Sequence, residues 1–503
     1  MNQEDDILRR LGWEILSLQP PCWGSLPAEL RTMILEWTAT ISKETKCPLA
    51  GYASVNQEWR DFFEPLTFRS LRLLPTCLDE FDRIVRDAKR RQHVRHIWFR
   101  YNRRCRCENR SFRFLEPVNM HAFAAGIIHL FHILESWTGR DRSENAPLLT
   151  LELSAFAAID PDHSMKDSVP EEIEGVDLEN DKDVRAALYR KHPAALIHRP
   201  EAQFSEWERK SYYLSPSRTD PFPAGPLPKV RAVNLLVIRR HTHSVFFAPF
   251  LKTIIPALPC LVSLTYEPWR KHPSSQEVES ALLSQIISIL PSCFRGLVIF
   301  EDHSETYRGH GTPRVYTDRC SALAQQLSRV GNLKHLCVSY AIDAKDFFAD
   351  FYTTSTTSAS REWGKLETLT LTSNLIRLDE SPDSITRLLL AAGRAAKNMP
   401  NLKGLEIYNV HDLDGGVFRF RVTDEVTVVS WVSSWKFELS EEAIQPWREM
   451  YEQSRSQSFE VRVFAERKRF LEWPSCILPV LYSRKIVVHP VTYCNMMNGN
   501  NRL

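Results

Sequence analysis

The sequence lacks a long apolar run. Its first residues, MNQEDDILRRLGWEILSLQPP, are acidic and contain no sustained apolar stretch, so we expect no secretory signal there. The least charged long stretch, residues 118–134, contains three histidines and an asparagine. A membrane span needs about 20 apolar residues, so we expect this stretch to form a buried helix and expect no membrane partner.

An excess of one charge is also missing. The 503 residues include 64 Lys or Arg and 62 Asp or Glu, a net charge of +2, so overall charge indicates no class of partner. The 11 cysteines are odd in number and widely scattered. This usage favours reduced thiols, and we therefore expect a cytoplasmic or nuclear protein.

Motifs for catalysis and cofactor binding are absent as well. Asp302, His303 and Ser304 are consecutive, and adjacent residues point apart, so they cannot relay a proton as a triad. No G-x-S-x-G accompanies them, and RGHGTPR, residues 308–314, lacks the third glycine of a nucleotide fingerprint. We therefore expect no enzymatic activity and no cofactor.

Two groups of residues raise the question of a metal site. Cys105 and Cys107 form a C-x-C near His93 and His96, but a zinc site needs four ligands and no second cysteine pair exists. The His-x-His at 241–243 has no third ligand nearby. We expect no bound metal.

Residues 83–113 form a basic segment with twelve Lys or Arg and two acidic residues. Such a cluster could bind nucleic-acid phosphates. It lacks the interleaved aromatic residues of a base-stacking surface. We favour a solvated helix face followed by an Arg-rich loop, with nucleic-acid binding as the alternative.

SLPAELRTMILEW, residues 25–37, is typical of a helix N-terminus. Pro27 suits the first turn, and Glu29 lies near the positive end of the helix dipole. One apolar stripe recurs at helical spacing; it comprises Leu26, Leu30, Met33, Ile34, Trp37 and Ile41. Leu35, with Ala28 and Ala39, falls on the opposite side.

Two more short helices are expected after a turn through SKETKCP. The first surrounds Leu49, and the second is capped by Asn56 and ended by Pro65. A unit of about 40 residues is too small to hold a robust core alone. Leu35 is therefore expected to contact either a partner protein or the following domain, and periodicity does not decide between them.

LPAELRTMIL followed by LAGYASVNQEWRDFFEPLTFRSLRL resembles the F-box of fungal F-box proteins, by its Leu-Pro-x-Glu-Leu opening and its later Val-x-x-x-Trp. The resemblance implies a three-helix module, residues 25–68, that binds the Skp adaptor and through it a cullin. The adaptor-binding residues that it marks are Leu26, Pro27, Leu30, Ile34, Leu35, Leu49, Val55 and Trp59. Leu26, Pro27 and Leu35 are expected at the adaptor. Leu30, Ile34 and Trp59 are expected in the module's own core.

Beyond residue 68, one pattern recurs nine times: apolar, two residues, apolar, one residue, apolar. It occurs in FRSLRL, VRHIWF, LLTLEL, VRAVNL, LVSLTY, FRGLVI, LKHLCV, LETLTL and LKGLEI, and it places Leu148, Val230, Val233 and Leu235 at repeat positions. Helical patterns lie between the later copies. A short strand followed by a helix, repeated, buries its apolar sides by stacking on its neighbours. The alternative is an ordinary α/β domain with coincidental leucine spacing.

The pattern resembles leucine-rich repeats in a long, degenerate form, with the usual asparagine only at Asn374. We therefore predict an α/β fold: an N-terminal three-helix F-box and a leucine-rich-repeat-like solenoid with parallel strands. The expected segments are an extension at 1–24, the F-box, repeats at 69–410 with an acidic and Pro-rich insertion at about 159–228, a cap at 411–485 and a frayed tail at 486–503.

These features together predict a substrate receptor of a Skp–cullin–F-box ubiquitin ligase, without chemistry of its own. The F-box would dock on the Skp adaptor, and the repeat region would hold an unknown target protein, with loops 160–227 and 300–318 as the expected recognition segments. An interaction scaffold without a role in ubiquitination fits the same residues.

Overall fold

The computed structural model describes residues 22–45, 47–103, 112–137, 148–157, 222, 225–239, 247–268, 273–301, 318–353, 363–411, 414–452, 456–465, 474–493 and 496. The chain forms two compact units, Met1–Ser70 and Leu71–Leu503. Each unit has a buried apolar cluster of its own.

The N-terminal unit is helical. Its elements are η1 (Trp23–Ser25), α2 (Ala28–Thr45), η2 (Leu49–Ser54) and α3 (Gln57–Phe68). As predicted, the Asn56 side chain caps α3 by accepting the N–H of Trp59 at 3.0 Å. Helix α2 continues through Thr45, so the turn predicted from Ser42 is wrong.

Pro65 does not end the third helix as predicted but lies inside it. Proline removes one backbone donor, which by itself destabilises a helix. Phe63 and Leu66, on either side, both belong to the apolar cluster of this unit. Their packing holds the last turn of α3 in place despite the missing hydrogen bond.

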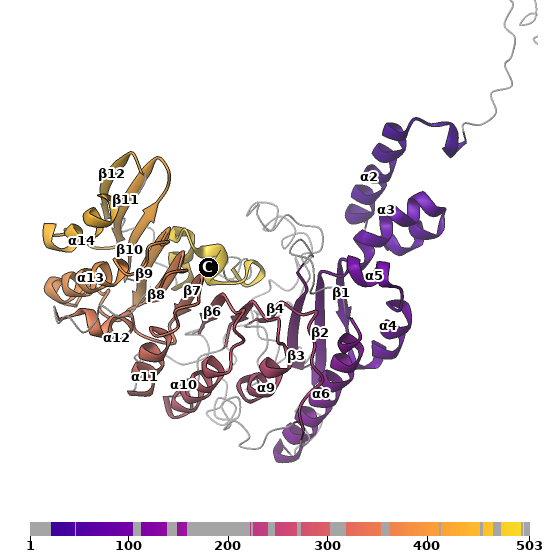
Figure 1. The fold of residues 1–503 in the computed structure, drawn as a ribbon, viewed down its shortest axis with the longest axis horizontal. Helices are drawn as coiled ribbons and strands as arrows, with labels where there is room; N and C mark the ends of the chain where they lie inside the picture. Colours follow the sequence, from indigo (N-terminus) through magenta and orange to yellow (C-terminus); the bar gives the residue numbers. More distant parts are fainter. Residues whose placement is uncertain are drawn as a thin grey trace, which may run out of the picture. The chain divides into compact units, whose positions relative to one another are not determined.

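The larger unit is built on one sheet of twelve strands, and its strands follow one another in chain order (Figure 1). The strands are β1 (Ser70–Leu73), β2 (His96–Arg103), β3 (Thr150–Ala157), β4 (Leu235–Ile238), β5 (Ser263–Tyr266), β6 (Gly296–Phe300), β7 (His335–Ser339), β8 (Thr368–Thr372), β9 (Gly404–His411), β10 (Asp414–Val422), β11 (Val426–Ser433) and β12 (Ser458–Ala465). Strands β2 to β9 are parallel, β10 is antiparallel to both its neighbours, and β12 is parallel to β11. The predicted α/β class with parallel strands is thus confirmed at this level.

Helices follow most strands and lie along one side of the sheet (Figure 1). They are η3 (Pro75–Cys77), α4 (Leu78–Ile84), α5 (Ala88–His93), α6 (Phe112–Glu135), α9 (Phe247–Ile254), η4 (Ile255–Ala257), α10 (Pro273–Ser288), α11 (Asp318–Leu327), α12 (Ala344–Phe347), η6 (Ala349–Phe351), α13 (Pro382–Ala396) and α14 (Glu441–Glu452). Helix α6 contains the stretch predicted to be a buried helix, and Ile127 and Phe131 are indeed fully buried. Among the described helices, none combines the length and apolar character needed to cross a bilayer.

Two rows of buried apolar side chains cross the sheet on the helix side, because neighbouring strands pair in matched register. The first row contains Ile97, Leu151, Leu236, Leu264, Leu297, Leu336, Leu369, Leu405, Phe420 and Val429. The second, two residues away on each strand, contains Phe99, Leu153, Ile238, Tyr266, Ile299, Val338, Leu371, Ile407, Phe418 and Trp431. Phe123 of α6 stacks on Phe99, and Trp447 of α14 contacts Phe418, so helices cover both ends of these rows.

Backbone hydrogen bonds repeat with the strands. The carbonyl oxygen of Arg295 accepts the N–H groups of Lys334 and His335, at the start of the next strand. The carbonyls of Lys334 and Glu367 do the same for the strands that follow them. Strands β7, β8 and β9 therefore each begin on the carbonyl of the residue directly before the preceding strand, which sets their register.

All nine occurrences of the sequence pattern overlap a strand, but the predicted register is wrong at β4, and at β3 the first apolar position is misplaced. At β4 the repeat positions are Val233, Leu236 and Ile238; the predicted Val230 and Val233 are also buried, but the predicted Leu235 is only partly buried. VNLLVI satisfies the same spacing as VRAVNL, and pairing of Leu236 with its neighbours selects it.

At β3 the error is one residue. Leu148, predicted at a repeat position, is 50% exposed, whereas Leu149 is fully buried. The Leu149 N–H donates to Oδ1 of Asn234 at 3.1 Å, which anchors this residue to the next strand and leaves Leu148 outside.

The C-terminal segment forms a strap across the other side of the sheet. The strap consists of η8 (Pro474–Val480), α15 (Arg484–Val487) and residues up to Tyr493 and Met496. Val488 and Tyr493 are buried, so the frayed tail predicted from residue 486 is wrong for the described part of that segment.

Truncating a leucine in the two buried rows should strongly reduce the stability of the larger unit. We expect Leu369→Ala to destabilise the larger unit by about 2–5 kcal/mol, because a fully buried leucine leaves a cavity. Urea unfolding followed by circular dichroism measures this. Leu378→Ala is the matched control: Leu378 is 55% exposed, and its truncation should change stability by less than about 0.5 kcal/mol. Equal effects of the two changes would contradict the assigned register.

Candidate functional site

The N-terminal unit carries an exposed apolar stripe along α2, which we call the α2 stripe. Its members are Leu30, Met33, Ile34, Trp37 and Ile41, with exposed fractions of 45, 50, 40, 69 and 53%. Val55, between η2 and α3, is 58% exposed. Monomeric proteins seldom leave large apolar side chains grouped on their surface, so such a stripe indicates a protein-binding site.

The opposite side of α2 faces the core of the unit. Leu35 is 4% exposed and packs with Ala39 and with Phe63 of α3. Around them lie partly buried side chains, mostly aromatic: Trp23, Leu49, Tyr52, Ala53, Trp59, Phe62 and Leu66. The second apolar side of this helix is thus used inside the unit, and neither alternative considered for Leu35, a partner or the next domain, is correct.

The eight F-box residues named from the sequence are therefore divided between core and surface. Leu35, Leu49 and Trp59 belong to the cluster. Leu30, Ile34, Val55 and Pro27 are exposed, and Leu26 is half-buried. The expectation that Leu30 and Ile34 form the core, with Leu35 outside, is wrong, because the aromatic rings of η2 and α3 pack on the Leu35 side.

A polar contact fixes the start of α2 against α3. The Glu58 carboxylate accepts Nε1 of Trp23 at 2.7 Å and Nε of Arg31 at 3.0 Å. Arg31 also donates through Nη1 to the Leu26 carbonyl at 3.2 Å. With the stacked rings of Trp59 and Phe63, 5.5 Å apart, these bonds hold the α2 stripe on a fixed frame.

Met33, Trp37 and Ile41 extend the exposed surface beyond the eight residues marked by the F-box resemblance. Their spacing placed them on one stripe with Leu30. Periodicity alone did not show whether this stripe faces solvent or the core, because both sides of α2 carry apolar residues.

The second candidate surface is the strap side of the sheet, and Glu406 of β9 is its main anchor. Its buried carboxylate accepts the N–H groups of Tyr482 and Ser483 at 3.0 and 2.9 Å, together with the Ser483 hydroxyl. Arg419 of β10 donates to it through Nε at 2.9 Å and also contacts the Val480 carbonyl. The strap is thereby tied to the sheet at the beginning of α15.

A second carboxylate ties the other end of the strap. Glu267, directly after β5, accepts the N–H of His489 at 2.5 Å and the hydroxyl of Thr492 at 2.6 Å. Nearby, Glu152 of β3 accepts Nε of Arg239 at 2.6 Å and lies 3.0 Å from Nε2 of His96. These buried charges are compensated by one another and by strap donors.

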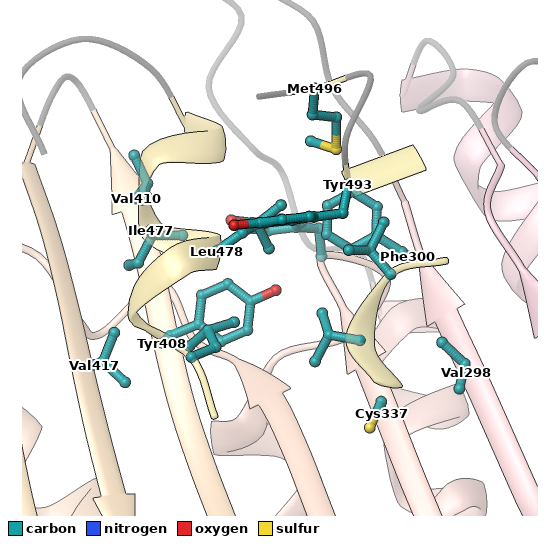
Figure 2. Packing of buried hydrophobic residues seen from close by; sticks show 14 of the residues in the cluster. Val298, Phe300, Cys337, Tyr408, Val410, Val417, Ile477, Leu478, Tyr493 and Met496 are labelled. Atoms are coloured by element: carbon teal, nitrogen blue, oxygen red, sulfur yellow. The ribbon is translucent and has the colours of Figure 1, made fainter. Parts of the chain in front are cut away.

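The strap also seals an apolar cluster between its two anchors (Figure 2). Ile477 and Leu478 of η8 lie beside Tyr408 of β9 there, and Cys337 of β7 belongs to the same cluster. The buried apolar residues of the strap are Ile477, Leu478, Leu481, Val487, Val488, Val491, Tyr493 and Met496. Fully burying one such side chain contributes about 1.5–3 kcal/mol before the entropy of ordering the chain is counted. The strap is therefore part of the core, and it covers this side of the sheet from β6 to β10.

Chemical sites considered from the sequence find little support in the described residues. No group of three or more His, Cys, Asp or Glu there could hold a metal. His96 contacts Glu152 instead. Cys105 and Cys107, the 241–243 histidines, Asp302 to Ser304 and RGHGTPR lie outside the described residues.

The basic segment is described up to residue 103, and several of its arginines serve the fold. Arg91 donates to the carbonyls of Val85 and Ser136, and Arg90 donates to that of Ile84. Guanidinium groups occupied in this way are poor phosphate ligands. This part of the segment thus favours the interpretation of a structural helix face.

Comparison with known proteins adds one match. Residues 289–489 match the model of a family of unknown function, DUF6546. No curated protein matches the chain. The matched segment runs from the end of α10 to His489, so it includes strands β6 to β12, Glu406 and the strap up to His489.

The strap should respond to pH through His489. Burial lowers the pKa of His489 to about 3, with Arg239 and His96 acting in the same direction and Glu152 opposing them. In the unfolded chain the imidazole takes up a proton near pH 6.5. The stability that the neutral ring supports is therefore present above pH 6.5 and is lost as the pH falls towards 3.

We expect the amide protons of 477–493 to exchange faster at pH 5 than at pH 7, after correction for intrinsic rates. In His489→Asn this difference should shrink, because asparagine does not titrate and its Oδ1 can accept the Val491 N–H that His489 Nδ1 now accepts. Hydrogen exchange read by mass spectrometry measures both chains. An unchanged pH response in the variant would contradict the role of His489.

Proposed function

We propose that this protein is a non-catalytic substrate receptor of a Skp–cullin–F-box ubiquitin ligase. In this proposal the N-terminal unit is an F-box that docks on the Skp adaptor. The larger unit is a leucine-rich-repeat-like solenoid that holds a target protein. Such a receptor works by raising the effective concentration of target lysines near the ubiquitin-loaded enzyme.

The observation that carries the proposal is the α2 stripe on a unit that already has its own core. Leu35 and Phe63 satisfy that core, so exposure of Ile34 and Trp37 is not needed for folding. An adaptor that covers the stripe would supply the missing burial. Fully buried aromatic anchors dominate the energies of such interfaces, which makes Trp37 the main candidate.

The larger unit supports a recognition role less directly. The sequential strand order and the repeated carbonyl contacts fit a solenoid. Because the strap covers one side of the sheet from β6 to β10, we propose that the target binds to loops rather than across these strands. Loops 160–227 and 300–318 remain our candidates from the sequence and lie almost wholly outside the described residues.

The test replaces apolar members of the α2 stripe by aspartate. We expect Ile34→Asp and Trp37→Asp each to weaken adaptor binding at least about 30-fold, the effect of losing an interface anchor. Co-purification of the full chain with the Skp adaptor, followed by titration calorimetry, measures this. Thr32→Asp introduces the same charge at an exposed position of α2 outside the stripe and should bind normally.

Thermal unfolding provides the folding check, since both replaced side chains are exposed in the free chain. Adaptor binding that survives the double change Ile34→Asp with Trp37→Asp would contradict the docking assignment. If the adaptor binds but neither a cullin nor target turnover follows, the interaction scaffold becomes the better description.

A further inference from the structure

The last strand of the sheet has an open edge. Strand β12 pairs in parallel with β11, and no strand lies on its other side among the described residues. Seven of its eight residues are exposed, including Val461, Val463 and Phe464 at 40, 45 and 47%. Proteins usually protect such an edge with lysine, proline, a bulge or a covering segment, because it offers free backbone groups to another strand.

The side chains of β12 alternate in a self-complementary way. Phe459, Val461 and Val463 lie on the helix side, where Phe459 packs against Tyr451 of α14. The opposite side carries Ser458, Glu460, Arg462 and Phe464, with Arg462 Nε donating to Glu460 at 2.8 Å. Over residues 459–463 the pattern is symmetric about Val461 in polarity and antisymmetric in charge; outside them Ser458 corresponds to Phe464.

We propose that β12 pairs antiparallel with β12 of a second copy of this chain, about a two-fold axis through Val461. Glu460 of each chain then lies opposite Arg462 of the other, and Phe459 lies opposite Val463. Directly opposed residues have Cβ atoms about 5 Å apart, so both charge pairs and all three apolar pairs are in contact. The interface is isologous, as closed dimers require.

Neighbouring registers are disfavoured. An axis through Glu460 would oppose two carboxylates, and an axis through Arg462 would oppose two guanidinium groups. An axis midway between Val461 and either neighbouring residue would place Glu460 and Arg462 opposite apolar residues. The register about Val461 thus combines unlike charges with matched faces, which is why a second copy fits this edge better than an arbitrary strand.

Charge reversal tests the pairing with the full chain. Glu460→Arg and Arg462→Glu each create two like-charge contacts in a homodimer, so each should raise the dimer dissociation constant about tenfold or more. Mixing the two variants restores both unlike pairs, and a mixed dimer should form with the strength of the wild-type dimer. Sedimentation velocity over a concentration series measures all three.

Two controls complete the test. Val461→Asp places two carboxylates on the axis and should give a monomer at concentrations where the wild type is dimeric. Glu438→Arg reverses an exposed charge outside β12 and should leave the dimer intact. Thermal unfolding measured well below the dimer dissociation constant should be unchanged in all variants, because the altered side chains are exposed in the single chain.

A wild-type chain that stays monomeric at high concentration would overturn the proposal, even if its edge captured a foreign peptide strand. Dimers that persist in Val461→Asp, or single charge variants that do not recover on mixing, would also overturn it. None of these readouts involves the α2 stripe, so the proposed function stands or fails independently.

Discussion

The buried carboxylate of Glu406 is the group on which the architecture of the larger unit depends most, because it needs several hydrogen-bond donors. A charged group buried in a sheet is costly unless several donors reach it. Arg419 provides one donor from the next strand, and the backbone at Tyr482 and Ser483 provides the others. The strap therefore completes the sheet electrostatically as well as by apolar burial, and Glu267 repeats the arrangement at the other end.

This closure decides which surfaces remain for function. Helices pack on one side of the sheet, and the strap packs on the other side from β6 to β10, so these faces of the strands are used for stability. Tyr340, the one described non-glycine residue with positive φ, illustrates the tightness of this packing. Its N–H donates to Thr372 Oγ1, and its ring packs edge-on against both Phe300 and Tyr408. Partners must then use loops, edges or the N-terminal unit.

The positions of the repeat strands were predictable, because the last two apolar residues of most L-x-x-L-x-L copies are the residues of the two buried rows. The pattern occurs at nearly every strand, so each copy supports the others. Register at β4 was not predictable, since two overlapping copies of the pattern satisfy the same spacing there. The prediction of a frayed tail from residue 486 was wrong for a different reason. The buried residues of the strap, such as Leu481 and Val488, follow no single period because η8 and α15 are short and joined by turns.

The N-terminal unit shows most clearly what sequence periodicity cannot predict. Leu30 and Leu35 are both leucines on one helix, and periodicity separates their sides without saying which side is buried. That depends on where η2 and α3 place the rings of Tyr52 and Phe63, which is a tertiary property. The aromatic content of NQEWRDFF, residues 56–63, was the available signal: a third helix this aromatic needs a complementary surface, and Leu35 with Ala39 provides it.

The large apolar side chains left exposed in the described residues are concentrated rather than scattered. Six belong to the N-terminal unit and three to β12, whereas Leu148 and Leu378 stand alone and Ile486, at 37%, lies on α15. Tyr482 is exposed but flanked by the guanidinium groups of Arg419 and Arg421, 4.0 and 4.5 Å from its ring, which gives it a local structural role. The two concentrations coincide with the two surfaces assigned here to partners. A receptor that used both would carry two adaptor-docking units per particle, and such bivalence strengthens capture of a multivalent target without any new contact.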